Sequence, residues 1–385
     1  LDARSLPFTP FGREPDDVVI VGAAGGNDIL ASLHFGAGHI DAIELNPVTY
    51  DLLTDTYAEF SGNVAQHPDV DYQLGDGRSF VERSDGGFDL VWYPAPDSYA
   101  ASNAASAGAF VLSESFLYTV EAIDASLDRL SDDGIMATQF GELDYDGRPY
   151  RTARYISNVR EALSGRGVDD PGAHVMVATS PTDVGANVYS TILVKATPFT
   201  DAEVERFEAQ AAEMAAADGG TDVVVRHVPG QPADGTPVTE ILALPDDDLD
   251  AFYDAYPYDL TPITDDQPYF WNFARPGTVL RDLTTPLETH ETFDPESGIG
   301  ERVLLLLLGI ATLLGVVFLI VPFLAIRRDW ASLPRKGTSM IYFASLGVGF
   351  LFYEITLIQR LTLFLGSREE YRRQFREHPG TYYIT

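Results

Sequence analysis

The longest uncharged stretch of the sequence constrains the fold most. The 24 residues from Val303 to Ile326 carry no charged side chain. At 1.5 Å per residue, a helix of this length spans the hydrocarbon core of a bilayer, which is about 30 Å thick. A second hydrophobic stretch, Met340 to Gly366, is less uniform because Glu354 lies within it. We predict two transmembrane helices within residues 301–366, followed by a tail at 367–385.

Upstream of these stretches, short apolar runs alternate with helical segments, which predicts an α/β fold with a doubly wound parallel sheet. The apolar runs that we expect to form strands are Val18–Val21, Ile40–Leu45, Val70–Leu74, Phe88–Tyr93, Ile135–Gln139, Ala173–Thr179 and Tyr189–Lys195. The segments that we expect to form helices are Asp28–Phe35, Pro47–Phe60, Arg78–Arg83, Ser113–Leu130 and Tyr150–Ser164.

We place this α/β domain at residues 18–200, after an N-terminal arm at 1–17. Residues 201–300 follow as an acidic accessory region, rich in Pro, Asp and Thr, which opens with a predicted surface helix at Thr200–Ala217. An aromatic cluster, Tyr269–Phe273, lies near its end.

Charge is distributed very unevenly. The chain has a formal net charge of −33, and its first 300 residues hold 52 acidic against 15 basic side chains. Such a surface repels phosphate backbones, so a nucleic-acid partner is not expected. A salt-adapted, halophilic-type surface is one explanation of the acidity. Attraction of a small cationic substrate is the other.

Two kinds of chemistry are not expected from the composition. The sequence contains no cysteine, which excludes disulfides, thiolate catalysis and cysteine metal ligands. Its seven histidines show no ligand spacing such as His-x-x-x-His, so no metal site is predicted.

A turn of small residues follows the first predicted strand. Gly22, Gly25 and Gly26 lie in this turn, where the backbone can approach a ligand beside the start of the next helix. The dinucleotide pattern would require glycine where Ala24 and Asn27 stand, which disfavours a nicotinamide cofactor. Taken alone, such a turn can equally be structural.

Acidic residues at the ends of the next two strands strengthen a cofactor interpretation. Glu44 ends the second strand, 22 positions after Gly22, where a carboxylate can accept both hydroxyls of a ribose. Asp76 and Gly77 follow the third strand, and a carboxylate there can accept the amino group of adenine. Because ligands bind at the carboxyl ends of strands in doubly wound sheets, these features predict one adenosine-binding crevice.

The sequence resembles a known family in several segments. Val18–Gly26, Ala42–Pro47, Gly75–Gly77, Phe88–Asp97, Ser113–Tyr118 and Asp133–Ile135 are similar to the spermidine synthase branch of the S-adenosylmethionine-dependent transferases, above all its membrane-associated members. Thr264–Phe270 and the stretch from Tyr342 to Arg360 add to the resemblance. It implies a Rossmann-like methyltransferase-type sheet followed by transmembrane helices.

The resemblance assigns cofactor residues one by one. Gly22, Gly25 and Gly26 would surround the methionine part of S-adenosylmethionine or its decarboxylated form. Glu44 would hold the ribose, and Asp76, followed by Gly77, would hold the adenine.

The active-site segment of the family is only partly present. Aminopropyl-transferring members carry two aspartates after the fourth strand, and here Pro94 takes the first position while Asp97 matches the second. Asp97 would orient and deprotonate an amine acceptor, helped by Glu114 or Tyr118. Asp97 could instead cap a turn, and Glu114 could be an ordinary acid in the first turn of a helix.

Two functions remain open from the sequence. The first is a membrane-associated transferase that moves an aminopropyl or a methyl group to a small cationic or other small-molecule acceptor. The second is a non-catalytic cofactor-binding domain that regulates a membrane helix bundle. In either case we expect the lipid bilayer, and further membrane helices, as partners.

Membrane orientation receives conflicting indications. Four basic residues lie between the two hydrophobic stretches, and the positive-inside rule would place them in the cytoplasm, with the acidic domain outside. Arginines on the other side of the stretches weaken this argument. Supply of the cofactor favours a cytoplasmic location of the acidic domain. We therefore expect a multi-pass membrane protein whose acidic domain lies in the cytoplasm.

Overall fold

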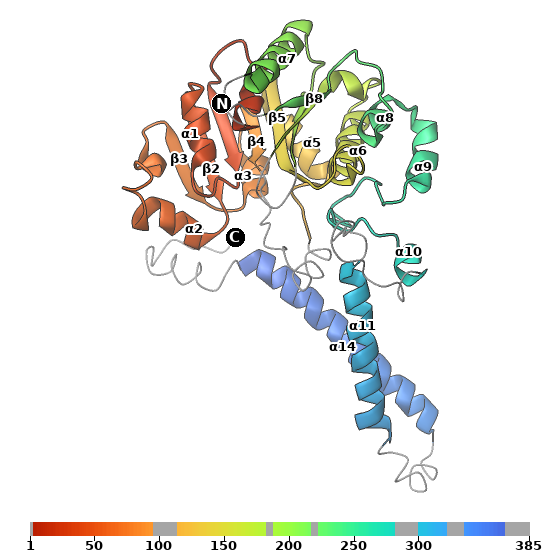
Figure 1. The fold of residues 1–385 in the computed structure, drawn as a ribbon. Helices are drawn as coiled ribbons and strands as arrows, with labels where there is room; N and C mark the ends of the chain where they lie inside the picture. Colours follow the sequence, from red (N-terminus) through yellow and green to blue (C-terminus); the bar gives the residue numbers. More distant parts are fainter. Residues whose placement is uncertain are drawn as a thin grey trace. The chain divides into compact units, whose positions relative to one another are not determined.

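The computed structural model describes residues 3–94, 114–181, 188–216, 222–281, 299–321 and 335–365 (Figure 1). The chain divides into two compact units, Leu1–Leu304 and Leu305–Thr385. The first unit holds the sheet and the helices that cover it.

One sheet of eight strands forms the centre of the first unit, in the order β3-β2-β1-β4-β5-β7-β6-β8. The strands are β1 (Asp17–Val21), β2 (His39–Glu44), β3 (Val70–Leu74), β4 (Phe88–Pro94), β5 (Leu130–Glu142), β6 (Val175–Pro181), β7 (Val188–Val194) and β8 (Val224–His227). Six of them coincide with predicted apolar runs to within a few residues, and β5 contains the seventh run but is longer at both ends.

The sheet is mixed, not wholly parallel as predicted. The pairs β1–β2, β2–β3, β1–β4 and β4–β5 are parallel. β7 is inserted antiparallel between β5 and β6, and β8 pairs antiparallel with β6. With helices on both faces, this is the doubly wound Rossmann-like methyltransferase fold that the sequence predicted.

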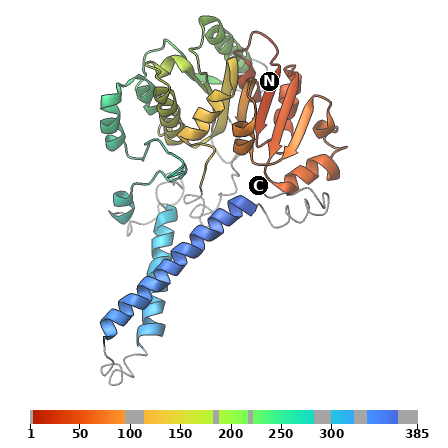
Figure 2. The ribbon, with the colours of Figure 1, turned by 180° about the vertical axis from the view of Figure 1, so that it is seen from behind.

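Helices cover both faces of the sheet (Figures 1 and 2). Two hydrophobic clusters fill the space between the sheet and these helices. One face is covered by η1 (Ala3–Phe8), α1 (Asn27–His34), α2 (Pro47–Asp51), η2 (Leu52–Thr56), η3 (Val64–Gln66) and α7 (Asp201–Ala216). The other is covered by α3 (Gly77–Arg83), α5 (Val120–Asp128), α6 (Tyr150–Gly165), α8 (Pro237–Ala243) and α9 (Asp246–Ala255). The elements η4 (Pro171–His174) and α10 (Pro276–Arg281) also belong to this unit.

The predicted helix Ser113–Leu130 is shorter than expected. Within the described residues it begins at Val120, where Thr119 caps the helix through its side-chain oxygen. Ser115 instead donates its backbone N–H to Pro268 at 2.6 Å, and Val120 donates to Ile263 at 3.0 Å. Tertiary pairing with the accessory region therefore overrides the helical periodicity before Thr119.

Two buried arginines of α6 attach the accessory region to the α/β core. Arg154 donates to the carbonyl oxygens of Phe270 and Asn272, and Arg160 donates to those of Ile241 and Leu244. Buried carbonyl groups require such donors, since an unsatisfied one destabilises the fold by about 1–3 kcal/mol. The accessory region is thus packed against the core through its backbone.

The described residues include two helices that are long and apolar enough to cross a membrane. α11 (Ile299–Gly315) continues into η5 (Val316–Ile320), and α14 spans Lys336–Leu365. The candidate membrane-spanning segments are Glu301–Phe318 and Gly337–Leu357, and neither segment is buried by other parts of the described structure. Length and composition alone support a membrane-spanning role for them.

The acidity of the first 300 residues leads to a prediction about stability. Self-repulsion of 52 acidic against 15 basic side chains should weaken as salt screens it. We expect the melting temperature of the chain to rise from low to molar potassium chloride, measured by circular dichroism. A flat or falling melting temperature would argue against a salt-adapted surface.

Candidate functional site

The polar residues predicted to bind a cofactor meet at one edge of the sheet. In the parallel pairing, Val21 lies opposite Ile43, and Glu44 lies opposite Leu74. The carboxyl ends of β1, β2 and β3 therefore lie side by side, and the residues that follow them share one edge. Ligands bind at this edge in doubly wound sheets.

The turn after β1 has backbone conformations that favour glycine. Gly22 and Gly26 both have φ near 86°, in the left-handed region. A Cβ atom at position 26 would lie 2.9 Å from Cγ1 of Val64, so the turn also packs closely against the side chain of Val64. No atom lies within 4 Å of the Cβ position of Gly25, so the turn presents its backbone to open space there.

Glu44 is the polar centre of this edge. Its side chain is only 7% exposed. One carboxylate oxygen accepts the N–H of Ala24 at 2.9 Å, and the other accepts the N–H of Asn46 at 2.6 Å. An ionised carboxylate has about four acceptor positions, so each oxygen retains capacity for a further donor. Glu44 thus fixes the turn and can still accept two ligand hydroxyls.

Tyr72 supports the same turn from β3. Its hydroxyl donates to the carbonyl oxygen of Ala24 at 3.0 Å, and its ring stacks on Tyr50 with 5.2 Å between centroids. Burial, reinforced by the charge of Glu44, raises the pKa of Tyr72, so the hydroxyl stays protonated and continues to donate. The turn is therefore held from two strands.

Asp76 is exposed and caps α3. Its Oδ1 atom accepts the backbone N–H of Ser79 at 2.8 Å, which leaves Oδ2 outside the capping bond. Gly77 follows as the first residue of α3 and is buried. A Cβ atom at this position would lie 2.3 Å from Cγ1 of Val21, so α3 approaches β1 too closely there for a larger residue. The close contact of α3 with β1 sets the position of Asp76 at the edge of the sheet.

Two hollows adjoin these residues and differ in polarity. The first, of about 290 Å³, is lined by residues that include Gly75, Asp76 and Ser79. The second, of about 430 Å³, begins at Gly25 and is lined mainly by apolar side chains, among them Leu30, Leu53 and Phe60. Only the first offers a carboxylate to a polar group such as the amino group of a purine.

The structure describes two of the three predicted catalytic residues, Glu114 and Tyr118. Asp97 lies outside the described residues, which end at Pro94 and resume at Glu114. Glu114 is exposed and directly precedes the segment that pairs with residues 263–268. Tyr118 is 1% exposed, and its ring stacks on Phe270 with 4.5 Å between centroids. The described residues therefore do not bring Glu114 and Tyr118 to a common open surface.

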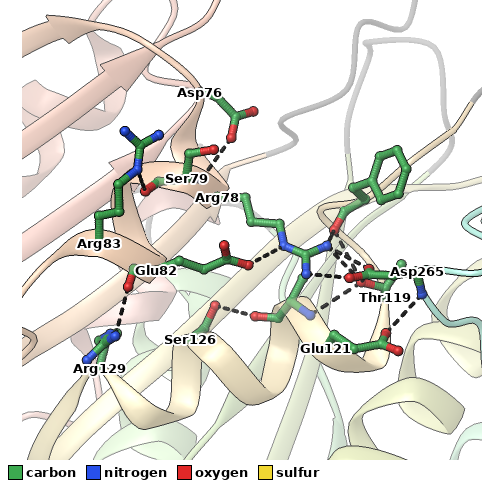
Figure 3. Close-up of polar contacts among 12 residues, drawn as sticks. Asp76, Arg78, Ser79, Glu82, Arg83, Thr119, Glu121, Ser126, Arg129 and Asp265 are labelled. Atoms are coloured by element: carbon green, nitrogen blue, oxygen red, sulfur yellow. Dashed lines mark hydrogen bonds and ion pairs between the residues drawn. The ribbon is translucent and has the colours of Figure 1, made fainter. Parts of the chain in front are cut away.

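A polar cluster beside Asp76 was not anticipated from the sequence. Arg78, in the first turn of α3, forms a bidentate ion pair with Asp265 and also donates to Thr119 and to the carbonyl oxygen of Phe116 (Figure 3). A cation is disfavoured at the N-terminal end of a helix dipole. Its position there was the one sequence signal that pointed to a nearby anionic partner.

The geometry suits an adenosine-type cofactor better than a dinucleotide. An acid after β3, an acid at the end of β2 and the glycine turn after β1 lie along one edge in that order, which is the order of the adenine, ribose and amino-acid portions of such a cofactor. Glu44 and Asp76 would accept the ribose hydroxyls and the adenine amino group. Within the described residues, no group of three or more His, Cys, Asp or Glu side chains could hold a metal ion.

The strand order and the antiparallel β7 are those of the Rossmann-like methyltransferase fold. Family models and curated protein sequences gave no match. Solved structures gave matches at low identity. A spermidine synthase in complex with the transition-state analogue AdoDATO has a TM-score of 0.39 and 13% identity, over 64% of this chain and 69% of that chain.

Two further solved structures have similar values. The spermidine synthase of Thermotoga maritima has a TM-score of 0.39 and 14% identity, over 64% of this chain and 70% of that chain. Human methyltransferase-like protein 13 in complex with SAH has a TM-score of 0.37 and 13% identity, over 56% of this chain and 90% of that chain. At these values the similarity assigns no activity, and function must be argued from the site.

Proposed function

We propose that the chain is a membrane-associated, spermidine synthase-like transferase that binds S-adenosylmethionine or decarboxylated S-adenosylmethionine. The observation that carries the proposal is Glu44. It is a nearly buried carboxylate at the end of β2 that fixes the glycine turn and retains acceptor capacity. Two donors separated like the vicinal hydroxyls of a ribose would complete its hydrogen bonding.

Other residues at the same edge of the sheet would make the remaining contacts with the cofactor. Asp76 would accept the adenine amino group beside the hollow that it lines. Gly22, Gly25 and Gly26 would lie along the amino-acid or aminopropyl portion, where the open space at Gly25 leaves room. Gly77 would keep α3 close enough to β1 for Asp76 to reach the ligand.

The cofactor supplies a carbon that is activated by a sulphonium group. In transfer, the lone pair of an acceptor atom forms a bond to that carbon, the sulphur–carbon bond breaks, and its electron pair neutralises the sulphur. An amine acceptor must lose a proton, and a carboxylate is suited to accept it. We assign this role to Asp97, assisted by Glu114, while the buried ring of Tyr118, stacked on Phe270, would support the segment that follows Glu114. Aminopropyl and methyl transfer are both compatible with these residues.

The acidic charge of the first unit supports a proposal for the acceptor, and the two apolar helices support a proposal for the location of the protein. A soluble unit with a large excess of acidic side chains concentrates cations near its surface, which favours a small cationic acceptor. The candidate spans would insert in a lipid bilayer, with the soluble unit on the cytoplasmic side, where the cofactor is made. Their exposed, largely apolar surfaces leave room for contact with further membrane helices.

The alternative is a cofactor-binding domain without catalysis that regulates a membrane helix bundle. The substitution of Pro94 for the first family aspartate favours it, since that position would otherwise supply a second carboxylate. The two functions share the cofactor site and differ in turnover.

Glu44→Ala tests the shared site. We expect the variant to bind S-adenosylhomocysteine more weakly by about 1–3 kcal/mol, the range for hydrogen bonds to a charged group. Isothermal titration calorimetry on the full chain in detergent measures the change.

Asp89→Ala is the matched control for Glu44→Ala. Asp89 is also a nearly buried carboxylate that accepts a backbone N–H, but it lies at the amino end of β4. The control should lose stability and retain affinity. An unchanged dissociation constant in folded Glu44→Ala would remove Glu44 from the site and undermine the cofactor assignment.

Turnover distinguishes the two candidate functions. The full chain would be incubated with putrescine and each of the two cofactor forms, and products would be identified by mass spectrometry. An aminopropylated or methylated product would establish a transferase. Cofactor binding without any product from this acceptor would favour the regulatory alternative.

A further inference from the structure

Arg78 joins three segments that are distant in the sequence (Figure 3). Its two terminal nitrogens donate to the two carboxylate oxygens of Asp265, both at 2.7 Å. It also donates to Oγ1 of Thr119 at 3.3 Å and to the carbonyl oxygen of Phe116 at 3.0 Å. Its Nε atom donates to Glu82 at 2.8 Å, one turn further along α3. The guanidinium group thus connects α3, the segment before α5 and the accessory region.

The ion pair is stronger than an ordinary surface pair. The side chain of Arg78 is 16% exposed, and bidentate pairing of arginine with a carboxylate adds geometric specificity to the charge attraction. Burial alone would raise the pKa of Asp265, but hydrogen bonds from Arg78 and Thr119 outweigh it and hold that pKa below its usual value. Asp265 therefore stays ionised throughout the neutral range.

The partners of Arg78 are themselves fixed. The backbone N–H of Asp265 donates to the side chain of Glu121 at 3.0 Å, and Oγ1 of Thr119 donates to Asp265 at 2.7 Å. Backbone hydrogen bonds from Ser115 to Pro268 and from Val120 to Ile263 hold the two segments together on either side. Arg78 is thus anchored to a rigid pair of segments.

The first turn of α3 needs such an anchor. α3 has only seven residues, and short helices have little stability of their own. Arg78 is the second residue after Asp76, so any displacement of its guanidinium group is transmitted directly to the capping turn. In that turn, Ser79 and Phe80 donate to the side chain and the carbonyl oxygen of Asp76.

We propose that Arg78, through its ion pair with Asp265, is a positioning residue that holds the carboxylate of Asp76 in place for recognition of adenine. The inference rests on the proposed cofactor site and makes the accessory region part of it. Arg78 acts through Asp76 and need not touch the ligand. Residues 263–270 would then influence which base the site accepts.

The test compares two ligands that differ at the adenine amino group. S-adenosylhomocysteine carries this group, and S-inosylhomocysteine has an oxygen in its place. Full-length wild type in detergent should bind the adenosine form at least about tenfold more tightly, the effect of one hydrogen bond to a charged group. Arg78→Lys and Asp265→Asn should reduce this preference to about threefold or less, because the carboxylate of Asp76 is no longer held. Calorimetry gives the two dissociation constants for each variant.

Arg13→Lys is the matched control. Arg13 also forms a bidentate ion pair, with Asp89 at 2.7 and 2.8 Å, but it does so at the opposite edge of the sheet. This variant should retain the wild-type preference even if it is less stable. Equal weakening of both ligands in Arg78→Lys, with an unchanged preference, would overturn the positioning role. A wild type that binds both ligands equally would also overturn it.

Hydrogen exchange separates failure of this inference from failure of the proposed function. If the wild type binds neither ligand, the proposed cofactor site is wrong. Exchange at the amides of Ser79 and Phe80 then decides the positioning of Asp76 by itself. Faster exchange in Arg78→Lys than in Arg13→Lys would support it, and equal exchange would overturn it.

Discussion

Replacing Arg154 with methionine is expected to lower the free energy of unfolding by about 2–4 kcal/mol, because two carbonyl groups lose their hydrogen-bond donor and each unsatisfied group destabilises the fold by about 1–3 kcal/mol. Arg154 is 2% exposed. Its guanidinium group donates to Phe270 at 2.9 Å and to Asn272 at 2.6 Å, and it pairs with Asp259 at 3.2 Å. Methionine retains much of the volume and removes every donor, so buried carbonyl groups lose their partners. Urea unfolding, followed by circular dichroism, measures the change.

Arg166→Met is the control for this prediction. Arg166 follows α6 directly and pairs with Asp124 and Asp128, but these carboxylates lie on the surface. Its loss should lower stability by no more than about 1 kcal/mol. A similarly small effect of Arg154→Met would show that the accessory region is held by other contacts.

Gly77→Ala should damage both the fold and the proposed cofactor site. The added Cβ atom would lie 2.3 Å from Cγ1 of Val21, whose side chain is 3% exposed and confined within β1. Overpacking of this kind destabilises by about 1–3 kcal/mol. Because α3 must move away from β1, Asp76 moves with it, and affinity for S-adenosylhomocysteine should fall roughly tenfold. Thermal melting and calorimetry measure the two effects.

Two further variants establish the cause of the Gly77→Ala effect. Gly25→Ala adds the same methyl group where no atom lies within 4 Å, so its stability should match the wild type. Combining Gly77→Ala with Val21→Ala makes room for the methyl group, and the double variant should lose less stability than the sum of the single variants. Additive losses would contradict a steric conflict between these two residues.

Local patterns were sufficient to predict the part of the fold that positions the cofactor site. Strands such as Val18–Val21 are continuous apolar runs, and a sheet buried on both faces requires them. The parallel connection of successive strands then places Gly22, Glu44 and Asp76 at one edge, which the observed register confirms. The roles of these residues toward a cofactor stay predictions.

Features that depend on distant parts of the chain could not be predicted. β8 has four residues in a segment of mixed composition, and its pairing with β6 is visible only in three dimensions. The late start of α5 depends on hydrogen bonds to residues 263–268. The contact of Arg78 with Asp265 joins residues 187 positions apart, beyond the range of any helical or strand periodicity.

The attachment of the accessory region through Arg154 also sets an order of events during synthesis. The carbonyl groups that Arg154 contacts belong to residues 270 and 272, which are synthesised 116 and 118 residues after the arginine itself. At typical translation rates this delay is on the order of ten seconds. During this delay, Arg154 of the nascent α6 must stay in contact with water or with a chaperone. The first candidate membrane-spanning helix begins at Ile299, shortly after these carbonyl groups, so the α/β core can be completed only as this helix is being synthesised.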